Sequence, residues 1–128
     1  MKIVYWILFC LSLAALILNF GLGLIGFGIF IFPMLILHIS NGLRLSKLND
    51  HKVAVILSVV NLFAFALLRP DGVHAMTGNG LSALLDLVGI DGGYNSADVN
   101  LYFGAACVLF FIQLVMDIRI RIIIHRVS

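Results

Sequence analysis

The sequence predicts an all-α integral membrane protein in which four transmembrane helices form a compact bundle. The first observation is that residues 3–43, 41 in all, contain no Asp, Glu, Lys or Arg. At about 1.5 Å per helical residue this stretch is about twice as long as one bilayer crossing, so the chain must fold back within it. The second observation is the composition, with 62% hydrophobic residues, 11% charged residues and a mean hydropathy of +1.16. These values lie outside the usual range of soluble proteins, and 128 residues leave room for a single membrane domain.

Four apolar segments are expected to span the membrane: residues 3–20, 24–39, 53–68 and 101–116. The first two are separated by a turn that Asn19, Gly21 and Gly23 favour. The third lies between Lys52 and Arg69. Because this segment is slightly short, we expect both long side chains to extend along the helix and place their charges among the lipid headgroups.

The basic residues predict the orientation of the chain. With four crossings, seven of the eight fall on one side, which the positive-inside rule assigns to the cytoplasm. The loop of residues 70–100 is acidic and is predicted to be extracytoplasmic. The loop of residues 40–52, the tail of residues 117–128 and both termini are predicted to be cytoplasmic, and the expected location is the bacterial inner (cytoplasmic) membrane. The seven basic residues are Lys2, Arg44, Lys47, Lys52, Arg119, Arg121 and Arg126.

Ionisable residues inside a membrane usually mark function, because burying them is costly. None is expected within the four spans, since His38 and Asp117 are assigned to cytoplasmic ends, and His38 has no evident partner inside the membrane. The deepest polar residues are uncharged: Ser12 and the three candidates for a role between helices, Ser58, Asn61 and Gln113. We expect them to form hydrogen bonds between helices, each contributing about 1 kcal/mol, and the alternative is that they line a polar pathway.

Glycines are dense at the beginning of the second span. Small residues allow the backbones of membrane helices to approach closely, so we predict helix packing here. The strict GxxxG spacing is missing, and no strand precedes the glycines as it would in a dinucleotide-binding loop. The predicted close-packing residues are Gly21, Gly23, Gly26 and Gly28.

The extracytoplasmic loop is too long for a simple connection. Its leucines at positions i, i+3 and i+4 and Val88 at i+7 predict a short amphipathic helix that ends at Gly89, lying on the membrane surface or capping the bundle. The oxygen-rich residues 91–98 lack the spacing of an EF-hand, so we predict a turn and a helix cap and no metal. The predicted sensing loop contains Asp71, Leu81, Leu84, Leu85, Asp86, Asp91 and Asp98.

The cytoplasmic side offers a loop and a tail. The tail fits a helix, in which Asp117 and Arg121 would form an i,i+4 pair, and its alternating Ile and Arg residues also fit a strand. The basic residues are expected to bind anionic lipid or to dock an acidic cytosolic partner. The predicted docking residues are Arg44, Lys47, Arg119, Arg121 and Arg126.

These features predict a subunit without enzymatic activity, because no nucleophile or acid–base pair is expected within reach of another. We expect it to oligomerise and to act as a sensor, anchor or scaffold for a cytosolic protein, for instance in a bacterial stress or antiphage defence complex. Its expected partners are the lipid bilayer, further copies of itself and that protein, with no direct nucleic acid and no cofactor. The alternative is an oligomeric ion channel or small-solute transporter with a pathway lined by uncharged polar residues.

Overall fold

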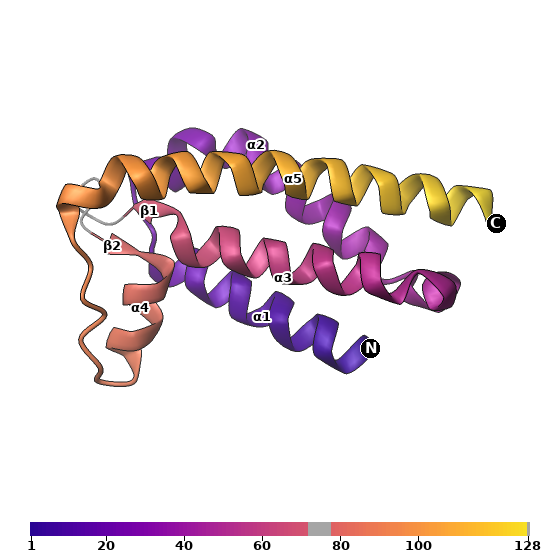
Figure 1. Ribbon diagram of the computed structural model, residues 1–128, viewed down its shortest axis with the longest axis horizontal. Coiled ribbons are helices and arrows are strands. Elements are labelled where there is room, and N and C mark those ends of the chain that lie inside the picture. The colour runs from indigo at the N-terminus through magenta and orange to yellow at the C-terminus, as the bar shows by residue number, and fades with distance from the viewer. Residues whose placement is uncertain (72–77, 128) are drawn as a thin grey trace.

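The computed structural model is a bundle of four long helices with a small lobe at one end (Figure 1). It describes residues 1–71 and 78–127, so residues 72–77 of the predicted sensing loop and Ser128 of the predicted tail lie outside the described residues. The all-α prediction is confirmed. The long helices are α1 (Lys2–Leu18), α2 (Leu22–Gly42), α3 (Lys52–Leu68) and α5 (Val99–Arg126).

The helices follow the apolar segments but extend further at the basic ends. α2 continues without a break through Pro33 to Gly42, and α5 continues to Arg126, so the ambiguous tail is a helix. Between α2 and α3, where we expected a loop, the chain forms the 3₁₀ helix η1 (Leu45–His51). Leu45 and Leu48 are fully buried there. This connection is therefore part of the packed bundle.

The lobe follows α3. Strand β1 (Pro70–Asp71) pairs antiparallel with β2 (Gly78–Asn79), a pairing that the sequence did not predict. Helix α4 (Gly80–Leu87) then begins with a capping box: the Asn79 side chain accepts the backbone N–H of Ser82 at 2.8 Å, and the Ser82 hydroxyl accepts the backbone N–H of Asn79 at 3.0 Å. The predicted amphipathic helix is therefore present. A second 3₁₀ helix, η2 (Ser96–Asp98), leads into α5.

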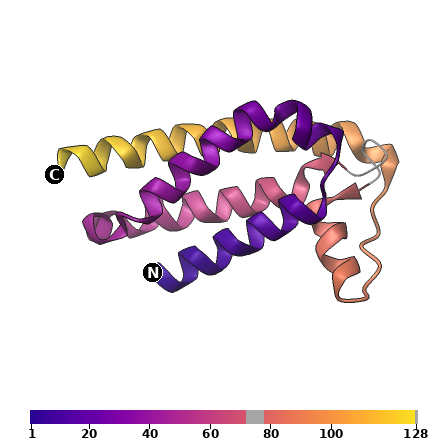
Figure 2. The same cartoon turned by 180° about the vertical axis from the view of Figure 1, so that it is seen from behind.

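The four long helices run alternately up and down the bundle. α3 packs mainly against α1 and α5, while α2 packs against α5. Both termini and η1 lie at one end, and β1, β2 and α4 lie at the other, as the two opposite views show (Figures 1 and 2). We call these the basic end and the lobe end.

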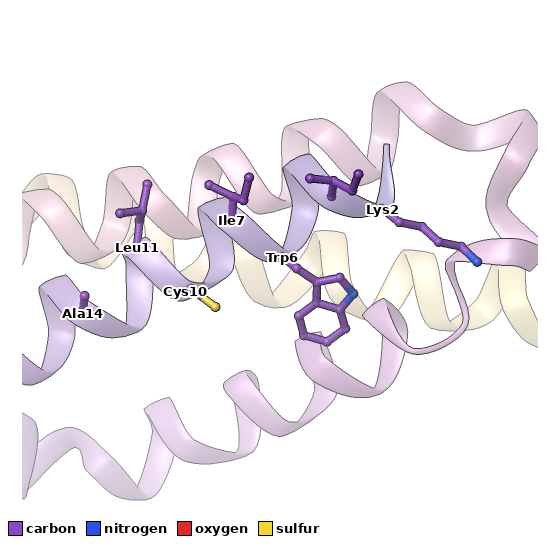
Figure 3. Close-up of a pocket in the computed structure, with 7 residues that line it drawn as sticks. Lys2, Trp6, Ile7, Cys10, Leu11 and Ala14 are labelled. Atoms are coloured by element: carbon purple, nitrogen blue, oxygen red, sulfur yellow. The ribbon is translucent and has the colours of Figure 1, made fainter.

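The outer surface of the bundle is apolar on every long helix, and Figure 3 shows part of the outer face of α1. One residue from each illustrates it: the exposed fractions of Ile3, Ile29, Val53 and Leu101 are 76%, 74%, 72% and 71%. By length and composition, the helical segments Leu22–Gly42 and Leu45–Leu68 could each cross a membrane, and Lys2–Leu18 is a shorter apolar helix.

Candidate functional site

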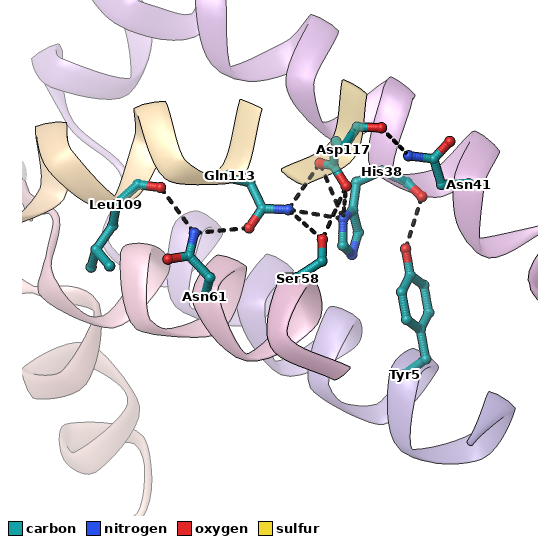
Figure 4. A network of polar contacts seen from close by, with 8 residues as sticks. All are labelled: Tyr5, His38, Asn41, Ser58, Asn61, Leu109, Gln113 and Asp117. Atoms are coloured by element: carbon teal, nitrogen blue, oxygen red, sulfur yellow. Dashed lines mark hydrogen bonds and ion pairs between the residues drawn. The ribbon is translucent and has the colours of Figure 1, made fainter. Parts of the chain in front are cut away.

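A cluster of polar side chains is buried between α2, α3 and α5, toward the basic end (Figure 4). Its centre is the carboxylate of Asp117, which contacts Nδ1 of His38 at 2.9 Å. The same carboxylate accepts hydrogen bonds from Oγ of Ser58 at 3.1 Å and from Nε2 of Gln113 at 2.9 Å. All four residues have an exposed fraction of 0%. One carboxylate thus joins three helices.

The hydrogen bonds of this cluster lead from Asn61 through Gln113 and Ser58 to the carboxylate of Asp117. The amide of Asn61 donates to the backbone oxygen of Leu109 at 2.9 Å and to Oε1 of Gln113 at 3.0 Å. The amide of Gln113 donates to Oγ of Ser58 at 3.0 Å as well as to Asp117. A flipped Gln113 amide would turn its oxygen toward the carboxylate, so the partners fix its orientation. We call His38, Ser58, Asn61, Gln113 and Asp117 the core network.

The imidazole of His38 is held by aromatic rings of α1. It stacks on Tyr5, with ring centroids 4.9 Å apart and an interplanar angle of 11°, and on Phe9 at 5.7 Å and 23°. The Tyr5 hydroxyl also donates to the backbone oxygen of His38 at 2.9 Å. One turn along α2, Asn41 donates to the backbone oxygen of Asp117 at 2.9 Å. Nε2 of His38 and Oδ1 of Asn41 have no hydrogen-bond partner among the described residues.

The core network corrects two predictions. His38 and Asp117 do not lie at helix ends, because α2 and α5 continue past them and bury both side chains, and His38 does have a partner in Asp117. The bundle therefore does contain ionisable residues. The expected pairing of Asp117 with Arg121 is also wrong, since Asp117 faces the core and Arg121 donates to Oγ of Ser40 at 2.7 Å.

A second buried cluster lies at the lobe end. The guanidinium of Arg69 forms an ion pair with the carboxylate of Asp71 and donates to the backbone oxygen of Asn19 at 2.8 Å. The side chain of Asn19 donates back to the backbone oxygen of Arg69 at 2.9 Å. We call Asn19, Arg69 and Asp71 the lobe-end clamp. It joins the end of α1 to the end of α3.

The clamp also caps α2. The Asp71 carboxylate accepts the backbone N–H of Gly23 at 3.1 Å and that of Leu24 at 2.7 Å. These amides belong to the first turn, where a helix has unsatisfied donors and a partial positive charge. A Cβ atom on Gly23 would lie 3.0 Å from the carboxylate, so glycine leaves room for this approach.

Two further predictions fail at the clamp. Arg69 was expected to reach toward lipid headgroups, but it is buried because the end of α1 offers it backbone oxygens and Asp71 offers it a carboxylate. Asp71 was expected to lie on a sensing loop, and it is buried with an exposed fraction of 1%. Both side chains therefore bind groups inside the bundle and hold its helix ends together.

Three of the four predicted close-packing glycines, Gly23, Gly26 and Gly28, do not have another long helix as their nearest neighbour among the described residues. Gly21 is the N-cap of α2, Gly23 faces Asp71, and Gly28 faces the ring of Phe32 in its own helix. Gly26 is exposed, and a Cβ atom there would meet nothing within 4 Å. The close approaches occur at glycines that the prediction omitted. A Cβ atom would lie 2.0 Å from the backbone oxygen of Ala66 at Gly80, 2.4 Å from Cα of Ser82 at Gly92, and 2.5 Å from the ring of Tyr5 at Gly42.

The remaining predicted residues lie on the surface at the two ends. Among the docking residues, Arg121 is half-buried and the other four are exposed: Arg44, Lys47, Arg119 and Arg126. In the lobe, Leu84 and Leu85 are half-buried, and the residues that are exposed are Leu81, Asp86, Asp91 and Asp98.

An aromatic pair lies where the lobe returns to the bundle. Tyr94 stacks on Tyr102, with ring centroids 5.5 Å apart. Burial raises the pKa of Tyr94, and Tyr102 and Asp98 add to this rise.

One sequence signal could have revealed the core network. Gln113, Asp117, Ile120 and Ile124 recur at i, i+4, i+7 and i+11, the spacing of one helical face, and all four are buried. Asp117 shares that stripe with isoleucines, which indicates that it faces the interior.

We found that no protein-family model, no curated protein and no solved structure matches this chain.

Proposed function

We propose that this protein is a four-span membrane subunit whose core network locks its helices together. A single observation carries the membrane placement: the bundle buries charged and amide side chains and exposes large apolar ones on all four long helices. In a soluble protein the burial of polar groups is the exception and a surface of this kind would associate. In lipid the same arrangement is favourable, because the tails solvate apolar side chains and buried polar groups find partners within the bundle.

The proposed membrane placement includes α1 and α5 as well as the two helical segments that are long and apolar enough to cross a membrane. Residues 99–116 of α5 contain no Asp, Glu, Lys or Arg, so the first part of this helix suits the hydrocarbon region. α1 begins with Lys2 at the basic end and exposes Ile3 and Ile17. The exposed basic residues gather at the end that also carries both termini, which favours a cytoplasmic basic end.

The geometry favours a structural role for the polar residues over a pathway within one copy. The amide of Gln113 and the hydroxyl of Ser58 donate to other side chains of the core network, and both residues have an exposed fraction of 0%. Interhelical hydrogen bonds of this kind contribute about 0.6 to 1.7 kcal/mol each. We propose that the protein acts as an oligomeric sensor, anchor or scaffold, with the lobe outside and a cytosolic partner on the basic end.

Purification from native membranes tests this role. The protein is extracted at its natural level in a mild detergent, and bound proteins are identified by mass spectrometry. We expect a stoichiometric cytosolic protein that is lost in Arg119→Glu, because the exposed guanidinium at this position would become a repulsive carboxylate. The matched control is Asp86→Lys, an exposed charge reversal in the lobe, which should retain the partner. A homo-oligomer without any second protein would contradict the proposal.

A second candidate function is an oligomeric channel or small-solute transporter. The observation in its favour is the buried His38–Asp117 pair, since ionisable groups inside a membrane often lie on ion or proton pathways. Asn61→Leu separates the two candidates. A scaffold should keep its partner and lose about 1 kcal/mol of stability, whereas a pathway should lose ion or solute flux into liposomes. Val60→Leu, at an exposed neighbouring position, is the control for both measurements.

A further inference from the structure

The outer face of α1 carries a shallow groove with a volume of about 780 Å³ (Figure 3). Lys2 lies at one end and Ala14 at the other. Lys2, Trp6 and Cys10 extend to one side of the helix, and Ile7 and Leu11 extend to the other. Lys2 is the single charged side chain among the residues that line this α1 groove.

The dimensions of the α1 groove match one leaflet of a bilayer. From Lys2 to Ala14 the helix rises twelve residues at about 1.5 Å each, or about 18 Å. One leaflet contributes about 15 Å of hydrocarbon, half of a core about 30 Å thick. With Lys2 at headgroup level, Trp6 would lie near the interface, where indole rings are enriched, and Ala14 near the middle of the bilayer. The groove thus offers a cation for a phosphate and an apolar surface as long as an acyl chain.

We infer that the α1 groove binds one anionic phospholipid of the cytoplasmic leaflet, with its phosphate paired to the Lys2 ammonium and an acyl chain along α1 toward Ala14. This inference rests on the proposed four-span placement.

A second copy of the chain fits the groove less well. Copies in one membrane share an orientation, so two α1 helices packed through this face would be parallel and would bring two Lys2 side chains together. Like charges in such contact are unfavourable.

Trp6 supplies the test, because it is the only tryptophan in the sequence and it lines the α1 groove. The full chain is reconstituted in phosphatidylcholine vesicles that contain a small fraction of either brominated phosphatidylglycerol or brominated phosphatidylcholine. Bromine atoms that contact the indole quench its fluorescence. We expect the anionic lipid to be favoured about fivefold at the groove, the preference that one lysine near an anionic surface provides. The preference should disappear in Lys2→Gln and at high salt.

Lys52→Gln is the matched control. Lys52 is also an exposed lysine at the basic end, but it belongs to α3 and does not line the α1 groove, so this variant should keep the preference for the anionic lipid.

Three results would overturn the inference, each in a different way. If neither lipid quenched the fluorescence, Trp6 would lie outside the membrane, and this result would reject the proposed four-span placement as well. Equal quenching by both lipids would leave the placement intact and reject the anionic lipid site alone. Efficient disulfide formation through Cys10 in a Cys107→Ser variant, together with weak quenching, would show that a second copy occupies the groove, since Cys10 is exposed and free there.

Discussion

The core network and the lobe-end clamp both bury a carboxylate beside a basic side chain, but they hold different parts of the chain together. In the core network the partners of Asp117 are side chains from three helices, and His38 lies 79 positions away in the sequence. In the lobe-end clamp Arg69 and Asp71 are two residues apart, and most of their other partners are backbone groups at helix ends. The clamp completes the termini of helices, whereas the core network sets how the helices face one another.

The largest effect is expected at the clamp. Asp71→Ala would leave Arg69 buried without its carboxylate, and a guanidinium cannot lose its proton. It would also remove the acceptor of the first amides of α2. We expect the free energy of unfolding in detergent to fall by about 3 to 5 kcal/mol, the usual loss when one partner of a buried pair is removed.

The control for this prediction is Asp86→Ala, because Asp86 is an exposed carboxylate of the same lobe. Equal losses in the two variants would show that the clamp contributes nothing beyond a surface charge.

A smaller loss is expected in the core network. Asp117→Ala removes the common acceptor of the network, but an imidazole can remain buried without charge, so we expect a loss of about 2 kcal/mol. In a double-mutant cycle with His38→Ala, the two losses should be non-additive by about 1 kcal/mol, measured by unfolding of both single variants and the double variant. Additive losses would mean that the two side chains contribute to stability independently and do not act as a pair.

The smallest effect compares two glycines, one from each end of the bundle. A methyl group at Gly80, in the lobe, would collide with the rigid backbone of Ala66, while one at Gly42, at the basic end, would meet the ring of Tyr5. A ring can shift where a backbone cannot, so we expect Gly80→Ala to be more destabilising than Gly42→Ala by about 1 kcal/mol, within the usual range for overpacking. Gly26→Ala, in open space, is the reference, and the reverse order of the first two would contradict the packing of α4 on α3.

Hydropathy predicted the four long helices because their apolar runs are longer than ordinary loops or strands, and the amphipathic helix of the lobe followed from its leucine spacing. Hydropathy and residue spacing could not predict which segments contact one another. Arg69 was treated as the end of one helix, when its surroundings are set by the end of α1, and His38 was judged without knowing that Asp117 lies across from it. The uncharged members of the core network, Ser58, Asn61 and Gln113, were singled out because they are polar residues deep within the predicted spans.

The arrangement around Asp117 has a consequence for how this protein can change over generations. One carboxylate contacts His38 and accepts hydrogen bonds from Ser58 and Gln113, so a replacement at any of these positions alters what the other two require. We expect descendants of this chain to keep the four residues together or to exchange them together. In an alignment of relatives, these columns should covary across α2, α3 and α5 even where the exposed apolar positions between them vary freely.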